Sequence, residues 1–193
     1  MNDNAKEMFN KGIVLITGKT SHETVGYLEE VLSIIVTKMT PPYADLTLVI
    51  ASNGGGCVLE IYDLLNLFPC KITGIVVGVA RSSASIALQA CDVRLATPNA
   101  RILIHHGSTG DINIDCLLNK EKRKIFLKET KDRAERFYDI YTKRSKVSRD
   151  KIVKLCYEDR DLYPEDAIKF GLLDGIWNKP LPISATGIDW NAK

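Results

Sequence analysis

The sequence has 193 residues, a length that suits one domain with a sizeable core and is short for two. Hydrophobic residues make up 45 % of the chain and charged residues 26 %, which is an ordinary globular composition. The formal net charge of +2 gives no electrostatic reason to expect nucleic acid or an anionic membrane as a partner. The five cysteines form no Cys-x-x-Cys pair and no Cys/His ligand spacing, so we predict neither a disulfide framework nor a metal site.

The sequence shows no pattern typical of a signal peptide or a membrane span. The stretch "MNDNAKEMFNKG" lacks the apolar core of a signal peptide. The longest apolar run, "ITGIVVGVA", is about half as long as a membrane span. We therefore expect a cytoplasmic protein without membrane contact.

Apolar runs alternate with helical patterns along the chain. The runs at 12–18, 46–52, 71–80, 93–97 and 101–106 predict strands, and helices are predicted over 21–39, 57–67, 82–91, 117–146 and from Ser148 onward. Thr20 and Glu23 have the spacing of a capping box, Pro164 suits a first helical turn, and Gly171 suits a helix end. This alternation predicts an α/β fold with much parallel sheet. We expect a single domain over 1–193, with its core at 12–178 and a C-terminal tail at 179–193.

Two stretches at strand ends could carry chemistry. In "GVARSSAS" (78–85), a serine between a strand and a helix either caps the helix or acts as a nucleophile beside oriented N–H groups. In "SNGGG" (52–56), the glycines form either a plain turn or a loop that approaches a ligand closely. If the strands are parallel neighbours, both stretches face one crevice at the carboxyl edge of the sheet.

Histidine and aspartate complete the set of candidates. His105 and His106 end the apolar run "RILIHH", where an imidazole is either a solvated turn residue or a general base. The turn "EDRD" (158–161) is either simply solvated or supplies the carboxylate that orients a histidine.

Taken in order, these motifs resemble the Clp protease proteolytic subunit (ClpP) family of the ClpP/crotonase superfamily, over roughly residues 12–178. "SNGG" stands for the family's Ser-Pro-Gly-Gly, "GVARSSAS" for its Gly-x-Ala-x-Ser, and "RILIHH" for its Arg-x-x-Ile-His. "DRDLYPEDAIKFGLLDGI" matches the closing segment of the family. The resemblance implies a ClpP/crotonase-like fold of repeated β-β-α units with a protruding handle helix, which falls within residues 117–146.

The resemblance also implies roles for particular residues. Ser82 falls on the nucleophile, His105 on the base and Asp161 on the acid of a Ser-His-Asp triad. The backbone N–H groups of Gly55 and Ser83 fall on the oxyanion hole. A further pair, Asp159 and Arg160, falls on residues that make contacts between two stacked rings in the family.

The implied function is a serine endopeptidase that cleaves peptides and unfolded proteins inside a homo-oligomeric chamber of stacked, heptameric rings. It would use no cofactor and no metal, and an AAA+ unfoldase is a possible partner. The partner is uncertain because about a dozen residues precede the first strand, and because Thr47 and Val49 stand where many members carry docking tyrosines. Two alternatives stay open, namely a catalytically inactive structural subunit and a crotonase-type acyl-CoA enzyme, for which Glu60 is the nearby acid.

Three further departures from the family pattern concern Arg81 and the stretch after His105. Arg81 replaces a small residue directly before the nucleophile. The loop "HGSTGDINID" after His105 lacks the usual Gln-Pro and Gly-Gly, and the distance in sequence from His105 to Asp161 is several residues longer than is typical. Arg81 predicts altered substrate preference or site geometry, and the longer stretch, which includes the handle helix, predicts a different ring stacking. Together these departures predict a divergent member of the family.

Overall fold

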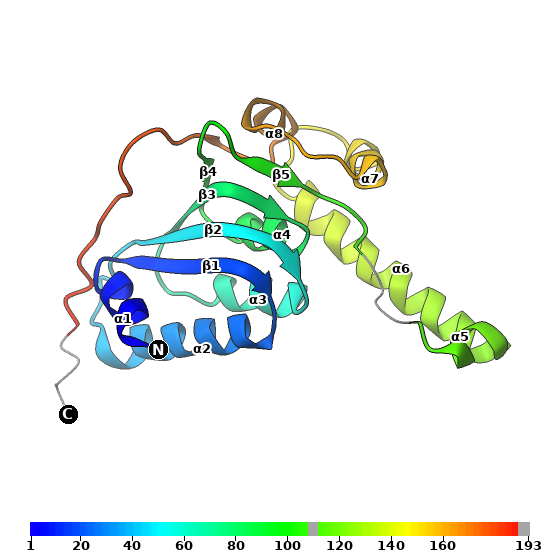
Figure 1. The fold of residues 1–193 in the computed structure, drawn as a ribbon, viewed down its shortest axis with the longest axis horizontal. Coiled ribbons are helices and arrows are strands. Elements are labelled where there is room, and N and C mark those ends of the chain that lie inside the picture. Colours follow the sequence, from blue (N-terminus) through cyan, green and yellow to red (C-terminus); the bar gives the residue numbers. More distant parts are fainter. Residues whose placement is uncertain (108–111, 189–193) are drawn as a thin grey trace.

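A computed structural model gives the fold of the chain and describes residues 1–107 and 112–188 (Figure 1). Its helices are α1 (Asp3–Asn10), α2 (His22–Lys38), α3 (Val58–Asn66), α4 (Ser83–Gln89), α5 (Ile114–Leu118), α6 (Lys120–Thr142), α7 (Arg149–Glu158) and α8 (Pro164–Phe170). Its strands are β1 (Ile13–Thr20), β2 (Leu46–Gly55), β3 (Ile72–Arg81), β4 (Val93–Ala96), β5 (Arg101–Leu103) and β6 (Gly175–Ile176).

All six strands belong to one parallel sheet. The order is β1-β2-β3-β4-β6, and β5 pairs with β3 beyond the point where β4 leaves it. Because the pairing is parallel throughout, the carboxyl ends of β1, β2, β3 and β5 lie at one edge of the sheet. The predicted α/β fold with a parallel sheet is confirmed.

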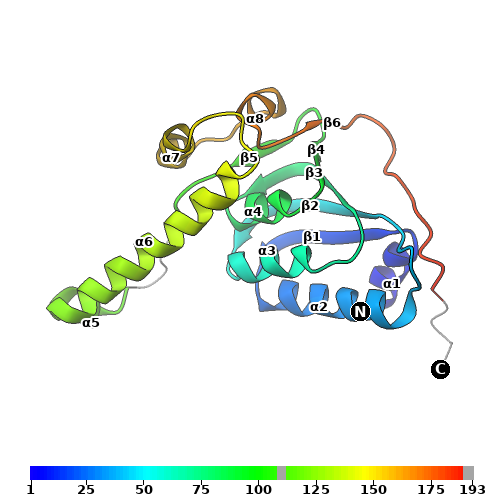
Figure 2. The same cartoon turned by 180° about the vertical axis from the view of Figure 1, so that it is seen from behind.

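Helices α2, α3 and α4 pack under one face of this sheet (Figures 1 and 2). The apolar residues of α2 recur at helical spacing, so one stripe of this helix is buried against the core (Leu28, Val31, Ile34 and Ile35). All seven residues of α4 are buried, because this helix lies between the sheet and the helices around it. The core therefore lies directly beneath the strand ends that carry the candidate site.

Helix α6 extends from the body of the molecule as an arm, with α5 at its outer end (Figures 1 and 2). Only the inner end of the arm is buried, at Phe137, Tyr138 and Tyr141. Large apolar side chains further out are exposed, including Leu118 at 77 % and Leu127 at 60 %. Among the described helices, α6 included, we find no stretch both long and apolar enough to cross a bilayer.

Helix ends agree with the sequence in some places and not in others. Pro164 begins α8, and Gly171 ends it in the left-handed conformation with φ of 76°, as predicted. The predicted capping box is wrong, because Ser21 and Thr24 form the box at the start of α2. Thr20 cannot cap this helix, since its side chain is buried and bonded to Ser83 instead.

The segment after β6 runs back to the turn that joins α1 to β1. Residues 3–10, where no helix was predicted, form α1 and bury Phe9. Beyond β6 the chain forms no helix or strand through residue 188, but Ser184 and Thr186 donate backbone hydrogen bonds to the carbonyls of Lys11 and Asn10. The first part of the predicted tail therefore runs back along the body of the protein, and the rest of it, 189–193, lies outside the described residues.

Candidate active site

The predicted site residues gather at the carboxyl edge of the sheet. Ser82 follows the last residue of β3, Gly55 ends β2, and His105 lies two residues beyond β5. Two mutual backbone hydrogen bonds between Ile102 and Leu162, of 2.9 and 2.8 Å, hold the segment after α7 against β5. This bridge brings Asp161 to the same edge from far along the chain.

Ser82 lies on a strained turn between β3 and α4. Its φ of 54° and ψ of −126° are unusual for a residue other than glycine, and its backbone N–H donates to the Leu103 carbonyl at 3.0 Å. Its side chain makes no capping hydrogen bond, so the capping interpretation of this serine does not hold. Strained backbone of this kind persists where the surroundings fix it, and it concentrates at functional sites.

The glycine loop approaches the serine turn and the end of β1 so closely that side chains at Gly54 and Gly55 would not fit. A Cβ on Gly54 would lie 2.6 Å from the Arg81 carbonyl oxygen, and one on Gly55 would lie 2.3 Å from the Thr20 carbonyl oxygen. The Gly55 N–H donates to Ser83 Oγ at 2.7 Å, and that hydroxyl also bonds Thr20 Oγ1 at 2.6 Å. The backbone N–H of Gly55, which is predicted to bind the oxyanion, therefore donates to the Ser83 hydroxyl instead. No sequence pattern predicts this contact.

The two histidines have different surroundings. His105 Nδ1 lies 3.3 Å from Asp159 Oδ1, and its buried Nε2 has no hydrogen-bond partner among the described residues. Its Nε2 is therefore not bonded to Ser82 Oγ. His106 packs against the rings of Tyr138 and Tyr157, and burial, aided by the charge of His105, lowers its pKa. The buried Nε2 of His106 likewise has no hydrogen-bond partner among the described residues. His105 therefore differs from His106 in its contact with Asp159, whereas His106 packs between aromatic rings.

Asp161 lies in the site but faces Arg81. Arg81 Nε donates to Asp161 Oδ1 at 2.8 Å and Arg81 Nη2 donates to Oδ2 at 2.5 Å, while Nη1 donates to Asn53 Oδ1 at 2.9 Å. Arg101 adds a second positive charge 3.6 Å from Asp161. The hydrogen bonds and charge of Arg81, with Arg101, lower the pKa of Asp161 against the opposing effect of its partial burial. Ser82, His105 and Asp161 thus share one edge without being joined as a hydrogen-bonded triad.

The residues predicted to meet a second ring lie on the surface. Asp159 ends α7 in the left-handed conformation with φ of 43°, and its side chain is 60 % exposed. Arg160 is also exposed and pairs with Glu158 at 2.9 Å. Both side chains are accessible to another subunit, and their role in ring contacts stays a prediction. Part of the altered loop after His105, residues 108–111, lies outside the described residues.

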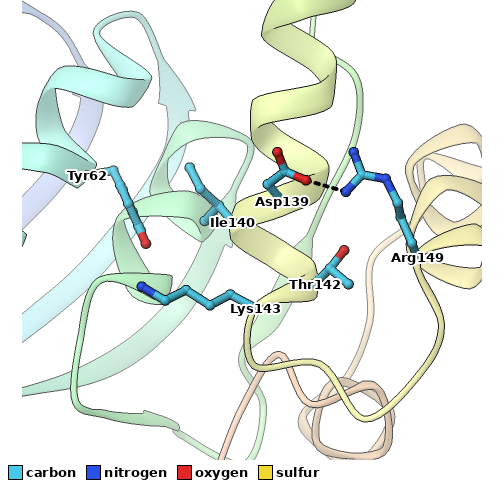
Figure 3. A pocket seen from close by; sticks show the side chains of 6 residues that line it. All are labelled: Tyr62, Asp139, Ile140, Thr142, Lys143 and Arg149. Atoms are coloured by element: carbon cyan, nitrogen blue, oxygen red, sulfur yellow. Dashed lines mark hydrogen bonds and ion pairs between the residues drawn. The ribbon is translucent and has the colours of Figure 1, made fainter.

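A hollow of about 460 Å³ lies elsewhere, between α3 and the inner end of α6 (Figure 3). Its lining includes Tyr62, Ile140 and Lys143, and an Asp139–Arg149 ion pair borders it. None of the predicted catalytic residues lines this hollow. The candidate site is therefore defined by the strand ends and not by this cavity.

Comparison with known proteins identifies the family of this chain. A profile of the Clp protease family matches residues 1–180. The ATP-dependent Clp protease proteolytic subunit of Deinococcus radiodurans is 32 % identical over 139 residues, which cover 70 % of this chain and 66 % of that protein. The ATP-dependent Clp protease proteolytic subunit 1 of Chlamydia trachomatis serovar D is 32 % identical over 144 residues, covering 72 % of this chain and 73 % of the relative. The predicted ClpP-like fold is confirmed, and the chain belongs to the Clp protease family.

Proposed function

We propose that this protein is a serine endopeptidase that cleaves peptides and unfolded proteins, with Ser82 as its nucleophile. The observation that carries the proposal is the strained Ser82 turn, which lies at one sheet edge with the glycine loop and with the free Nε2 of His105. A serine hydroxyl, an imidazole and backbone N–H groups at a helix start are what acyl transfer requires.

The chemistry follows from these positions. Ser82 Oγ attacks a peptide carbonyl while His105 Nε2 takes its proton, and the imidazolium then protonates the leaving amine. Water hydrolyses the resulting acyl-serine with the same histidine as base. The N–H groups of Gly55 and Ser83 hold the oxyanion, and each lowers the activation barrier by on the order of 3 kcal/mol. Asp161 orients His105 and stabilises the imidazolium.

This mechanism requires three local changes from the arrangement described above. The Gly55 N–H must leave Ser83 Oγ to meet the oxyanion, and Asp161 must leave Arg81 to meet His105. His105 Nε2 must also form the hydrogen bond to Ser82 Oγ that it does not make here. Catalytic hydrogen bonds often tighten only when substrate is bound, so their absence here is compatible with activity.

We further propose that the subunit works in stacked rings, heptameric by resemblance, in which α5 and α6 meet a second ring. Exposed apolar residues on this charged arm support the proposal, because such side chains usually mark an interface (Ile114, Leu117, Leu118, Ile125 and Leu127). Light scattering should find an oligomer, and an Ile125→Glu/Leu127→Glu variant should give smaller particles. A monomer under conditions where the peptidase is active would exclude this assembly.

A fluorophosphonate probe tests the nucleophile directly. We expect it to label the wild type and Ser83→Ala but not Ser82→Ala, since only Ser82 would carry the reactive hydroxyl. Labelling that persists in Ser82→Ala would assign the nucleophile elsewhere.

A catalytically inactive structural subunit is the second candidate. It is favoured by one observation, namely that His105 is joined to neither Ser82 nor Asp161. An assembled ring that neither takes the probe nor cleaves any peptide would support this alternative.

A further inference from the structure

Arg81 holds both oxygens of the Asp161 carboxylate. The contact is bidentate, at 2.8 and 2.5 Å, which is the strongest geometry open to a guanidinium and a carboxylate. Both side chains are mostly buried, with 29 % and 24 % of their surfaces exposed, so solvent screens the pair less than it would a surface pair. Asp161 therefore has an alternative partner within the site where its carboxylate would serve His105.

The contact that His105 makes with Asp159 is weaker than the contact between Arg81 and Asp161. Asp159 Oδ1 lies 3.3 Å from Nδ1, beyond the usual range of 2.7–3.2 Å for such bonds, and the Asp159 side chain is 60 % exposed. Exposed ion pairs of this kind contribute little. His105 is thus left without a firm orienting group, while the carboxylate best placed to become one is held by Arg81.

Two departures from the family pattern meet at this point. Asn53 stands at the proline position of the Ser-Pro-Gly-Gly motif, and Arg81 stands at the small residue before the nucleophile. The structure joins them, since Arg81 Nη1 donates to Asn53 Oδ1 at 2.9 Å. Asn53 thereby helps to hold the guanidinium in the orientation that binds both oxygens of Asp161. We call this arrangement of Asn53, Arg81 and Asp161 the clamp.

We propose that Arg81 is a positioning residue that competes with His105 for Asp161, so that the site is catalytically assembled only in the fraction of molecules where Arg81 has released the carboxylate. The proposal rests on the serine peptidase function proposed above. Arg81 acts on turnover through Asp161, and it makes no contribution to substrate affinity. In the held form the peptidase has Ser82 and His105 without their acid.

Kinetics of four variants in the full-length protein test the competition. If the held form makes up about nine-tenths of the molecules, Arg81→Met raises kcat about tenfold and leaves KM unchanged. Arg81→Lys keeps the charge but loses the bidentate geometry, so its kcat lies between that of the wild type and that of Arg81→Met. In the absence of the carboxylate there is nothing to hold, so Asp161→Asn and Arg81→Met/Asp161→Asn have the same kcat.

Two matched controls separate the clamp from general charge effects. Arg101→Met removes a positive charge 3.6 Å from Asp161 without touching the bidentate contact, and we expect less than a twofold change in kcat. Asn53→Ala removes the residue that orients Arg81, and we expect kcat to rise, though by less than in Arg81→Met. Thermal denaturation of each variant shows whether the fold is retained.

A crystal structure of Arg81→Met gives a readout that does not depend on activity. We expect an Asp161 carboxylate oxygen within about 3 Å of His105 Nδ1, with Asp159 turned away. Asp161 still away from His105 in that structure would overturn the proposal even if no peptidase activity is ever found. A fall in kcat for Arg81→Met, a change confined to KM, or an Arg81 effect that persists without Asp161 would also overturn it.

Discussion

The Ser83 hydroxyl accepts a hydrogen bond of 2.7 Å from the Gly55 N–H, although the two residues come from different strand ends. The same hydroxyl reaches Thr20 at the end of β1, 2.6 Å away, so three strand ends are joined through one buried oxygen. In the proposed mechanism the oxyanion must accept a hydrogen bond from the same Gly55 N–H. The Ser83 side chain therefore stabilises the glycine loop, but it also competes with the oxyanion of the transition state for the Gly55 N–H.

Replacing Ser83 by alanine should separate these two effects. We expect Ser83→Ala to lower the free energy of unfolding by about 1–2 kcal/mol, because Thr20 Oγ1 and the Gly55 N–H lose a buried partner. Fluorophosphonate labelling should persist, since the freed N–H is then available to the oxyanion. Chemical denaturation and the labelling rate check the two parts, and loss of labelling in a folded Ser83→Ala protein would contradict the second.

Gly55 should tolerate no side chain, in contrast to Gly56, the residue that follows it. A Cβ on Gly55 would lie 2.3 Å from the Thr20 carbonyl oxygen, whereas one on Gly56 would meet nothing within 4 Å. We expect Gly55→Ala to displace the loop and to reduce labelling of Ser82 by at least about a hundredfold, the usual cost of losing one oxyanion donor. Gly56→Ala is the matched control and should label at close to the wild-type rate.

The two aspartates near His105 should differ in their effect on turnover. We expect Asp161→Asn to fold normally and to reduce kcat by roughly 10³–10⁴-fold, because asparagine would favour the wrong histidine tautomer. Asp159→Asn should change kcat by no more than about fivefold, since its contact with His105 is long and exposed. Peptidase assays on both variants decide which carboxylate serves His105, and the reverse order would assign that role to Asp159.

The ion pair between Arg94 and Asp174 should carry part of the stability. Arg94 is only 2 % exposed, and it donates to Asp174, to Gln89 and to the Gly171 carbonyl. Partial burial opposes the charged form of Asp174, but the hydrogen bonds and charge of Arg94, joined by Arg144, lower its pKa overall. Because the folded pKa lies below the unfolded one, this stabilisation is complete above about pH 4 and is lost as the pH falls through the folded value.

Asp174→Asn should therefore lower the free energy of unfolding at neutral pH by roughly 2–3 kcal/mol, since it leaves a buried guanidinium without its carboxylate. The variant should also lose less stability than the wild type between pH 5 and pH 3. Asp166→Asn, which removes the partner of the exposed Lys169, is the matched control and should change stability by less than about 0.5 kcal/mol. Equal pH dependence in wild type and Asp174→Asn would contradict this account.

Local chemistry made the strand ends and helix ends predictable. Apolar runs predicted β1 to β3, with glycine marking the ends of the first two, and Pro164 with Gly171 predicted α8, because each signal acts within a few residues of itself. The same locality explains the error at the start of α2. Thr20 has the right spacing for a cap, but a partner 63 residues away takes its hydroxyl, and Ser21 caps instead.

The contacts that distinguish this site could not be predicted in the same way. Arg81 and Asp161 are 80 residues apart, and their pairing depends on where the Ile102–Leu162 bridge places the second residue. The sequence marked Arg81 as unusual beside a nucleophile, which was a usable signal, but it did not show which carboxylate the guanidinium would reach. The sequence thus identifies the candidate residues and their order, whereas the fold determines which carboxylate pairs with the Arg81 guanidinium.

The last prediction concerns the size and state of the substrate. Ser82 is half-buried at the sheet edge, where a Cβ on Gly54 of the glycine loop would lie 2.6 Å from the Ser82 Cβ, so we expect an extended stretch of chain to reach Oγ more readily than a folded surface does. A ring chamber would add a second restriction, because folded proteins would be excluded by size. We therefore expect a short fluorogenic peptide and loosely folded casein to be cleaved without nucleotide, and a stable folded protein to resist until a separate ATP-driven unfoldase is added. The three substrates should be assayed side by side with Ser82→Ala as the blank. Rapid degradation of the folded protein by the subunit alone would refute the chamber, whereas an assembled protein that cleaves none of the three would support the inactive-subunit alternative.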